Sequence, residues 1–214
     1  VFAMFMQSCH KGGDPRTGLR IYDMNIANTT VKGQQHSSSA KRIAPTPHLV
    51  GSALQCCVSV GDWSKALRIY RSASQAKLRQ SVATVSSVVK ACCQGLKWRT
   101  ALDIIQRAPV VNEVAFHTLL VQMGREYSMP ASMGDRVVRM MRARGLEPDD
   151  RTFRILVVGY ARVRLWRRVL EVEAETKRLG ICLGPTVEPC YYQAKRALGM
   201  LGGRRKKFYM HRRK

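Results

Sequence analysis

The side chains of this chain that could do chemistry are above all its cations. The sequence holds 37 Lys and Arg residues against 14 Asp and Glu, a formal net charge of +23 at pH 7. Charge of one sign on this scale destabilises a compact fold unless a polyanion lies beside it. Nucleic acid is the polyanion we expect, because each phosphate that a cation neutralises releases a bound counterion and adds affinity. A basic surface that serves only solubility is the alternative.

Two stretches concentrate the candidate RNA-contacting residues. The C-terminal stretch has seven Lys or Arg residues, no acid, and two aromatic side chains that can stack on bases. The other is an arginine cluster expected at a turn between two helices. Contacts with phosphate position a protein on nucleic acid without reading its sequence. The alternatives are a disordered tail for the first and a solvated helix face for the second. The candidates are Arg204, Arg205, Lys206, Lys207, Phe208, Tyr209, Arg212, Arg213 and Lys214 in the tail, and Arg162, Arg164, Arg167 and Arg168 in the cluster.

A third group of arginines follows a single predicted helix. These are Arg136, Arg139, Arg142 and Arg144. We expect them to add to a phosphate-binding surface, and a solvated helix face is again the alternative.

No combination of residues indicates catalysis. The five histidines do not pair with Ser, Cys or carboxylates at a recurrent spacing, and no glycine-rich loop cradles a phosphate. The seven cysteines include no Cys-x-x-Cys pair, so a zinc site is not expected, and the doublets at Cys56–Cys57 and Cys92–Cys93 read as buried small apolar side chains in a reducing compartment. We therefore predict that the protein is not an enzyme and uses no metal, cofactor or small-molecule substrate.

A repeated pentapeptide indicates which structural elements position these cations. Trp63-Ser64-Lys65-Ala66-Leu67 returns 35 residues later as Trp98-Arg99-Thr100-Ala101-Leu102. An earlier segment, Gly13 to Tyr22, shares its first two and last four residues with Gly61 to Tyr70. Self-similarity at this period indicates an array of stacked units.

Each unit reads as two helices. The stretch from His48 to Val60 is mostly apolar, Gly61 interrupts it, and Asp62 is placed to cap the next helix. That second helix carries apolar residues at i, i+3, i+4 and i+7, beginning with Trp63. No alternating strand pattern competes. We therefore predict an all-α fold, an α-solenoid of two-helix (helix-turn-helix) repeats of about 35 residues.

The repeat pattern and the composition together suggest a division of the chain. We expect a partial helical repeat over residues 1–28, a polar linker over 29–46, and about four repeats over 47–185. A capping helix follows over 186–201, with its helical part from Glu188 to Met200 ended by Gly202 and Gly203, and the basic tail occupies 202–214. The sequence has no run of 18 apolar residues, so it predicts no membrane-spanning helix. Because residue 1 is not Met, we expect either a removed targeting segment or further upstream sequence.

The repeats resemble those of the pentatricopeptide repeat family. The strongest match runs from Met141 to Phe153, where Met ends a second helix and Gly-Leu-Glu-Pro-Asp leads to Thr and an aromatic residue. The Ala-Leu pairs at Ala66 and Ala101 match the second-helix signature, and Gly159-Tyr160 matches the first helix. The resemblance covers Pro47 to Gly180 well and Val1 to Asn28 in part. A tetratricopeptide array is the nearest competitor, but its aromatic pattern fits less well.

The resemblance implies RNA binding with one nucleotide read per repeat by a small set of side chains. Carried over position by position, the implied reading pairs are Gly51 with Ser81, Ser86 with Asn112, and His117 with Asp149, followed by Arg154 with a partner near Gly184. Only Ser86 with Asn112 is a pair of the kind associated with adenine. Gly51 offers no side chain, and His117 and Arg154 depart from the small polar residues expected.

These observations lead to two hypotheses. The first is a structural, non-catalytic component of the mitochondrial ribosome that contacts rRNA and neighbouring ribosomal proteins, because the array is short, most reading positions are unusable and the tail is basic. Repeat proteins of this family are recruited to such ribosomes, which is support by analogy. The second is a transcript-specific organellar factor for RNA processing, stability or translation. A helical scaffold that binds protein is a third class, disfavoured by the charge. The expected location is the mitochondrial matrix, with the plastid as the alternative.

Overall fold

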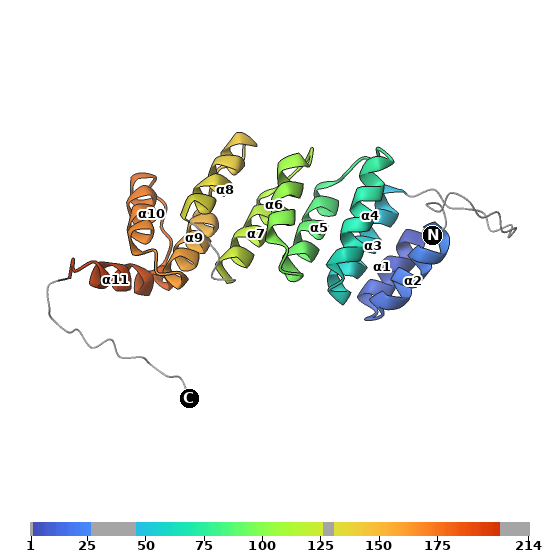
Figure 1. Cartoon of the computed structure of the whole chain (residues 1–214), viewed down its shortest axis with the longest axis horizontal. Helices are drawn as coiled ribbons and strands as arrows, with labels where there is room; N and C mark the ends of the chain where they lie inside the picture. The colour runs from blue at the N-terminus through green and yellow to red at the C-terminus, as the bar shows by residue number, and fades with distance from the viewer. Residues whose placement is uncertain (1, 27–45, 126–130, 202–214) are drawn as a thin grey trace, which may run out of the picture. The chain divides into compact units, whose positions relative to one another are not determined.

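A computed structural model describes residues 2–26, 46–125 and 131–201. All regular structure in these ranges is helical, with eleven α-helices and one short 3-10 turn and no strand. The helices pack in consecutive pairs, which confirms the prediction of an all-α fold built from two-helix repeats (Figure 1). Within the described ranges, no helix is long and apolar enough to cross a membrane. The chain divides into two compact units, which we describe separately.

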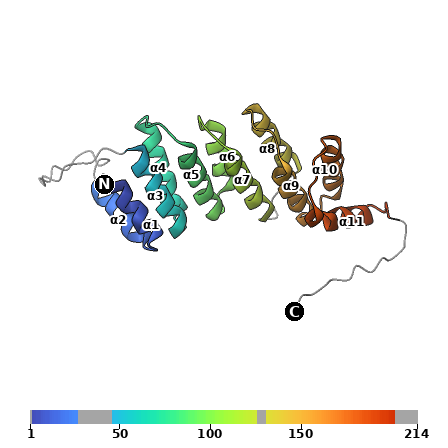
Figure 2. The same ribbon diagram turned by 180° about the vertical axis from the view of Figure 1, so that it is seen from behind.

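The first unit comprises Val1–Met123 and Val137–Glu147. Within it, α1, α3 and α5 pack on one another in series, and α2, α4 and α6 each pack on the first helix of their own pair. The second helices α2 and α4 also pack on the first helix of the following pair. Both views show α1 to α6 in chain order (Figure 1; Figure 2). The helices are α1 (Phe2–Lys11), α2 (Pro15–Ile26), α3 (Pro47–Val60), α4 (Trp63–Gln75), α5 (Val82–Gln94), α6 (Trp98–Arg107), most of α7 (Glu113–Arg125) and the second half of α8 (Ala131–Ala143).

Helix starts in this unit follow local capping chemistry. The Asp62 carboxylate accepts a hydrogen bond of 2.9 Å from the backbone N–H of Lys65 and so caps α4, as the sequence predicts. Thr46 caps α3 and Ser81 caps α5 in the same way. Gly61, with φ of 80°, ends α3 in the left-handed conformation that glycine adopts without penalty.

The repeated Ala-Leu pair lies where neighbouring helices approach. Ala66 and Ala101 are fully buried at equivalent positions of α4 and α6. Gly95 is explained by the same kind of approach: a Cβ atom there would lie 2.1 Å from Cδ1 of Trp63. Its φ is −82°, and the left-handed residue of the turn is Leu96 instead. Gly95 therefore admits the indole ring rather than an unusual backbone conformation.

The second unit comprises Gly124–Arg136 and Pro148–Lys214. Here α10 (Trp166–Arg178) packs on α9 (Asp150–Arg162) and on α11 (Glu188–Ala197), which follows the 3-10 turn η2 (Pro185–Val187). The core of α9 contains the predicted apolar residues, with Phe153 and Tyr160 each 1% exposed. The predicted end of the last helix at Gly202 and Gly203 was wrong. The helix ends at Ala197 because Gly199 turns left-handed and Met200 N–H bonds back to Lys195 O at 2.8 Å.

Candidate nucleic-acid interface

Cations in the first unit are concentrated on the second helix of each pair. Among the first helices, α3 has no Lys or Arg and α5 has only Lys90. Each of the second helices α2, α4 and α6 carries at least two exposed arginines, and these are Arg16, Arg20, Arg68, Arg71, Arg99 and Arg107. The exposed arginines of these helices therefore lie on the second helix of each pair.

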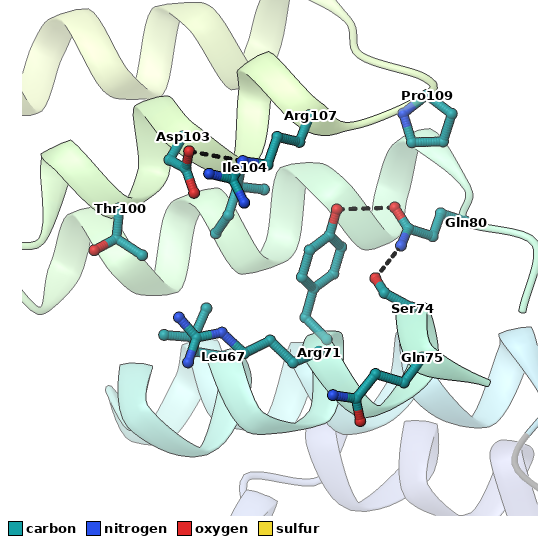
Figure 3. A pocket seen from close by; sticks show the side chains of 11 residues that line it. Leu67, Arg71, Ser74, Gln75, Gln80, Thr100, Asp103, Ile104, Arg107 and Pro109 are labelled. Carbon is teal, nitrogen blue, oxygen red and sulfur yellow. Dashed lines mark hydrogen bonds and ion pairs between the residues drawn. The ribbon is translucent and has the colours of Figure 1, made fainter. Parts of the chain in front are cut away.

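A groove lies between α4 and α6 on this basic side (Figure 3). Its volume is about 430 Å³, and its apolar lining residues include Leu67, Tyr70 and Ile104. Arg71 and Arg107 line its two sides, from α4 and α6 respectively. The volume is in the range of ligand-binding clefts in proteins. Neither arginine was among the residues singled out from the sequence. The available signal was a pair of cations eight and nine residues after the two copies of the repeated Trp.

One wall of the groove is fixed by a chain of hydrogen bonds. The hydroxyl of Tyr70 donates to Oε1 of Gln80 at 2.8 Å, and Nε2 of Gln80 donates to Oγ of Ser74. Burial raises the pKa of the Tyr70 hydroxyl, and the hydrogen bonds with Gln80 and Ser74 oppose that rise. The phenol thus stays neutral and able to donate.

The helix-turn arginine cluster divides between exposed and engaged side chains. Arg162, at the end of α9, and Arg164 and Arg167, beyond it, are exposed. Arg168 is held by protein groups: it forms ion pairs with Asp135 and Glu171, and its guanidinium lies 5.7 Å from the centre of the Tyr160 ring. Three of the four predicted arginines are therefore presented to solvent, and Arg168 joins α10 to the start of α8.

Arg144 does not belong with the phosphate-binding arginines that were expected to follow one helix. Its guanidinium donates to the backbone carbonyls of Ala108 and Gln106, each at 2.8 Å, and to that of Ile105 at 3.3 Å. These carbonyls end α6 and have no partner within that helix. Arg144 is thus a cap supplied by the turn after α8. Sequence reasoning missed it because the partners lie 36 to 39 residues away.

The predicted reading pair Ser86 and Asn112 is brought into direct contact. Oγ of Ser86, on α5, donates a hydrogen bond of 3.0 Å to Oδ1 of Asn112, just before α7. The same oxygen accepts the backbone N–H of Ala115 at 3.3 Å, so Asn112 also caps α7. Both side chains are half-buried. Both contacts use Oδ1, and the two donors of the Asn112 amide nitrogen take no part in them.

The other predicted reading residues are placed differently. His117 is only 4% exposed. Asp149 caps α9 by accepting a hydrogen bond of 2.8 Å from Thr152 N–H, and Arg154 forms an ion pair with Asp150 one turn earlier. Base reading by these three residues stays a prediction. The tail residues from Arg204 to Lys214 lie outside the described ranges.

The fold matches solved pentatricopeptide repeat structures. The chain superposes on maize PPR10 with a TM-score of 0.66 at 15% identity, covering 92% of this chain and 26% of that one. It matches the pentatricopeptide repeat domain of Arabidopsis thaliana protein-only RNase P 1, solved in complex with tRNA, with a TM-score of 0.67 at 14% identity, covering 90% of this chain and 96% of that domain. Arabidopsis protein-only RNase P 2 gives a TM-score of 0.70 at 15% identity, with 90% and 41% covered.

The likeness is one of structure rather than of sequence. No sequence family matches the chain, and no curated protein matches it in sequence. The chain spans about a quarter of the length of maize PPR10. PPR10 has also been solved with an 18-nt RNA element, and that structure matches with a TM-score of 0.59. The helix pairs, the caps between them and these superpositions lead to one conclusion: the chain has the two-helix repeat fold of pentatricopeptide repeat proteins.

Proposed function

We propose that this chain is a non-catalytic RNA-binding repeat protein that serves as a structural component of the mitochondrial ribosome. Its contacts with rRNA would be made to phosphates by basic helix faces and by the basic C-terminal stretch, beside neighbouring ribosomal proteins. The observation that carries this proposal is the concentration of exposed arginines on the second helices, combined with a single usable reading pair. Such a surface favours binding to a folded RNA through its backbone.

Two further observations support the RNA partner. The solved structures that share this fold include a repeat protein in complex with an 18-nt RNA element and a repeat domain in complex with tRNA. The net charge of +23 also favours a polyanion over an apolar protein surface. We propose the mitochondrial matrix as the location, with the plastid as the alternative.

A transcript-specific organellar factor is the second candidate, and the Ser86–Asn112 contact is the observation that favours it. That pair presents amide donors at a position from which a repeat of this kind can read one base. Sequence-specific binding of a transcript needs several such pairs in a row, and the other positions offer Gly51, His117 and Arg154.

The test is sedimentation of an organelle lysate through a high-salt sucrose gradient, with this protein followed by mass spectrometry. Comigration with one ribosomal subunit, abolished by ribonuclease, is the expected result, and it identifies the subunit. Occurrence in light fractions alone would contradict the ribosomal role. Crosslinking of the protein to its RNA would then test for a transcript-specific factor.

A further inference from the structure

We propose that the groove between α4 and α6 binds the phosphate backbone of RNA, with Arg71 and Arg107 as the phosphate contacts. This proposal rests on the proposed RNA binding and assigns it to a surface of the second helices. The reading pair Ser86 and Asn112 lies elsewhere, on a first helix and at the end of a unit. The proposal therefore separates phosphate binding from base reading within one array.

The kinds of side chain that line the groove suit a sugar-phosphate unit. Arg71 comes from α4 and Arg107 from α6, and the polar side chains of Ser74, Gln75 and Thr100 also line the groove (Figure 3). Arginine pairs with phosphate through two parallel hydrogen bonds, which a point-like lysine cation does not match. Hydroxyl and amide side chains are the usual companions of arginine at nucleic-acid phosphates. Because the remaining lining residues are largely apolar, the arginines and these polar side chains are the groups that can bind a phosphate.

Asp103 also lines the groove and forms an ion pair of 2.9 Å with Arg107. The side chains of the two are 51% and 80% exposed, and an exposed pair of this kind is weak and readily exchanged. Arg71, Arg107 and Asp103 together carry a net charge of +1. The carboxylate thus acts as a competitor that a phosphate must displace from Arg107. Removal of this carboxylate should therefore make the site bind RNA more tightly.

Cations beyond the groove indicate a polyanion rather than a single small anion. Arg68 lies one turn before Arg71 on α4, and Arg99 lies at the start of α6; both are exposed. On α2, Arg16 and Arg20 are exposed as well. A chain of phosphates can engage several of these cations at once, whereas a free phosphate or a nucleotide cannot span them. Each added contact raises affinity and steepens its dependence on salt.

The experiment compares two double variants of the full chain that remove the same charge. R71Q/R107Q alters the groove, and K11Q/K90Q removes two exposed cations from the first helices α1 and α5. Binding to a fluorescent RNA stem-loop is measured by anisotropy from 50 to 300 mM salt. Circular dichroism melting verifies that both variants keep the wild-type fold.

We expect R71Q/R107Q to weaken binding by about tenfold and to lower the slope of log affinity against log salt by about 1.4–1.8, since each lost phosphate contact contributes about 0.7–0.9. K11Q/K90Q should shift affinity by less than about threefold. The variant D103N should bind about threefold more tightly, because Arg107 is released from its competitor. E113Q, with the same charge change at the exposed start of α7, should not reproduce that gain.

Several outcomes would overturn the proposal. If wild-type protein binds RNA and both double variants lose affinity equally, the groove is not the site, although RNA binding stands. A polyglutamate chain that displaces the RNA at equal charge concentration would show a general anion surface instead. If the wild-type protein binds no RNA in this assay or in the lysate, the proposed function and this inference fail together.

Discussion

Ser86 and Asn112 meet across two successive repeats: the serine hydroxyl donates to Oδ1 of the asparagine at 3.0 Å. That oxygen also receives the backbone N–H of Ala115, so its acceptor capacity is used within the protein. Of the Asn112 side chain, only the amide nitrogen takes no part in these two contacts. Asn112 is therefore able to donate to a further partner but not to accept from one.

This arrangement gives a prediction for base preference. The variant N112D keeps the cap of α7, because Asp and Asn are equivalent caps, but it loses both amide donors. We expect it to lower affinity for an RNA carrying adenine at the contacted position by about tenfold, the effect of one lost hydrogen bond at about 1–1.5 kcal/mol. Binding assays with matched RNAs carrying adenine or uridine check this. Equal losses on both RNAs would mean that Asn112 reads no base.

A second prediction concerns Arg168, which contacts Asp135, Glu171 and the face of Tyr160. Its side chain is 27% exposed, so it is partly shielded from solvent. R168A should lower the free energy of unfolding by about 1–2 kcal/mol through loss of the cation–π contact and the paired charges. Urea unfolding followed by circular dichroism measures this.

The neighbouring residue supplies the control. Arg167 is exposed, and R167A should leave stability within about 0.5 kcal/mol of wild type. If it contacts phosphate as predicted, R167A should reduce the salt slope of RNA binding by about 1. Wild-type stability in R168A would show that its protein contacts contribute nothing measurable.

Two glycines in the first unit should respond to alanine with opposite signs. A Cβ atom at Gly95 would meet Cδ1 and Cγ of Trp63 at 2.1 and 2.3 Å, so G95A must displace the indole ring. We expect a loss of about 1–3 kcal/mol, as in other overpacked sites. Gly51 has open space around its Cβ position within α3, and G51A should raise stability by about 0.5–1 kcal/mol. Thermal unfolding of both variants tests the contrast, and a stable G95A would contradict the packing described here.

Stability should also fall in acid because of Glu173. Burial raises the pKa of its carboxyl, but hydrogen bonds from Lys195 at 2.8 Å and Lys177 at 2.9 Å outweigh burial, and the pKa lies below its ordinary value of 4.5. A carboxyl whose pKa is lowered by folding stabilises the folded state above pH 4.5. That contribution is lost as pH falls through the lowered value.

The variant E173Q tests this pH dependence. Its melting temperature should lie below that of wild type at pH 6, and the difference should shrink as the pH falls below 4.5. E188Q, at the exposed start of α11, is the control and should follow the wild-type curve. A difference that stays constant from pH 6 to pH 3 would argue for a purely steric effect at position 173.

Local sequence determined the helices and where they begin. Asp62 has a carboxylate three residues before the amide that it caps, and the apolar stripe from Trp63 to Tyr70 lies within one helix, so both were predictable from near neighbours. The repeat of about 35 residues was also predictable, because the matching residues recur at that spacing in the sequence itself. The family resemblance predicted Ser86 and Asn112 as a reading pair, and only the structure shows that the two side chains form a hydrogen bond with each other.

Tertiary structure alone decided the parts of the site that depend on distant residues. The sequence predicts Arg144 as one of a row of surface cations, and only the structure shows that it binds the carbonyls at the end of α6. The sequence predicts Gly95 as a helix breaker, and only the structure shows that Trp63, 32 residues earlier, packs against it. The groove with Arg71 and Arg107 exists only because the packing of successive repeats places residues of α4 and α6 around one cavity. Spacing along the chain determines which residues share a helix face, whereas the packing of one helix pair on the next determines which of those residues meet.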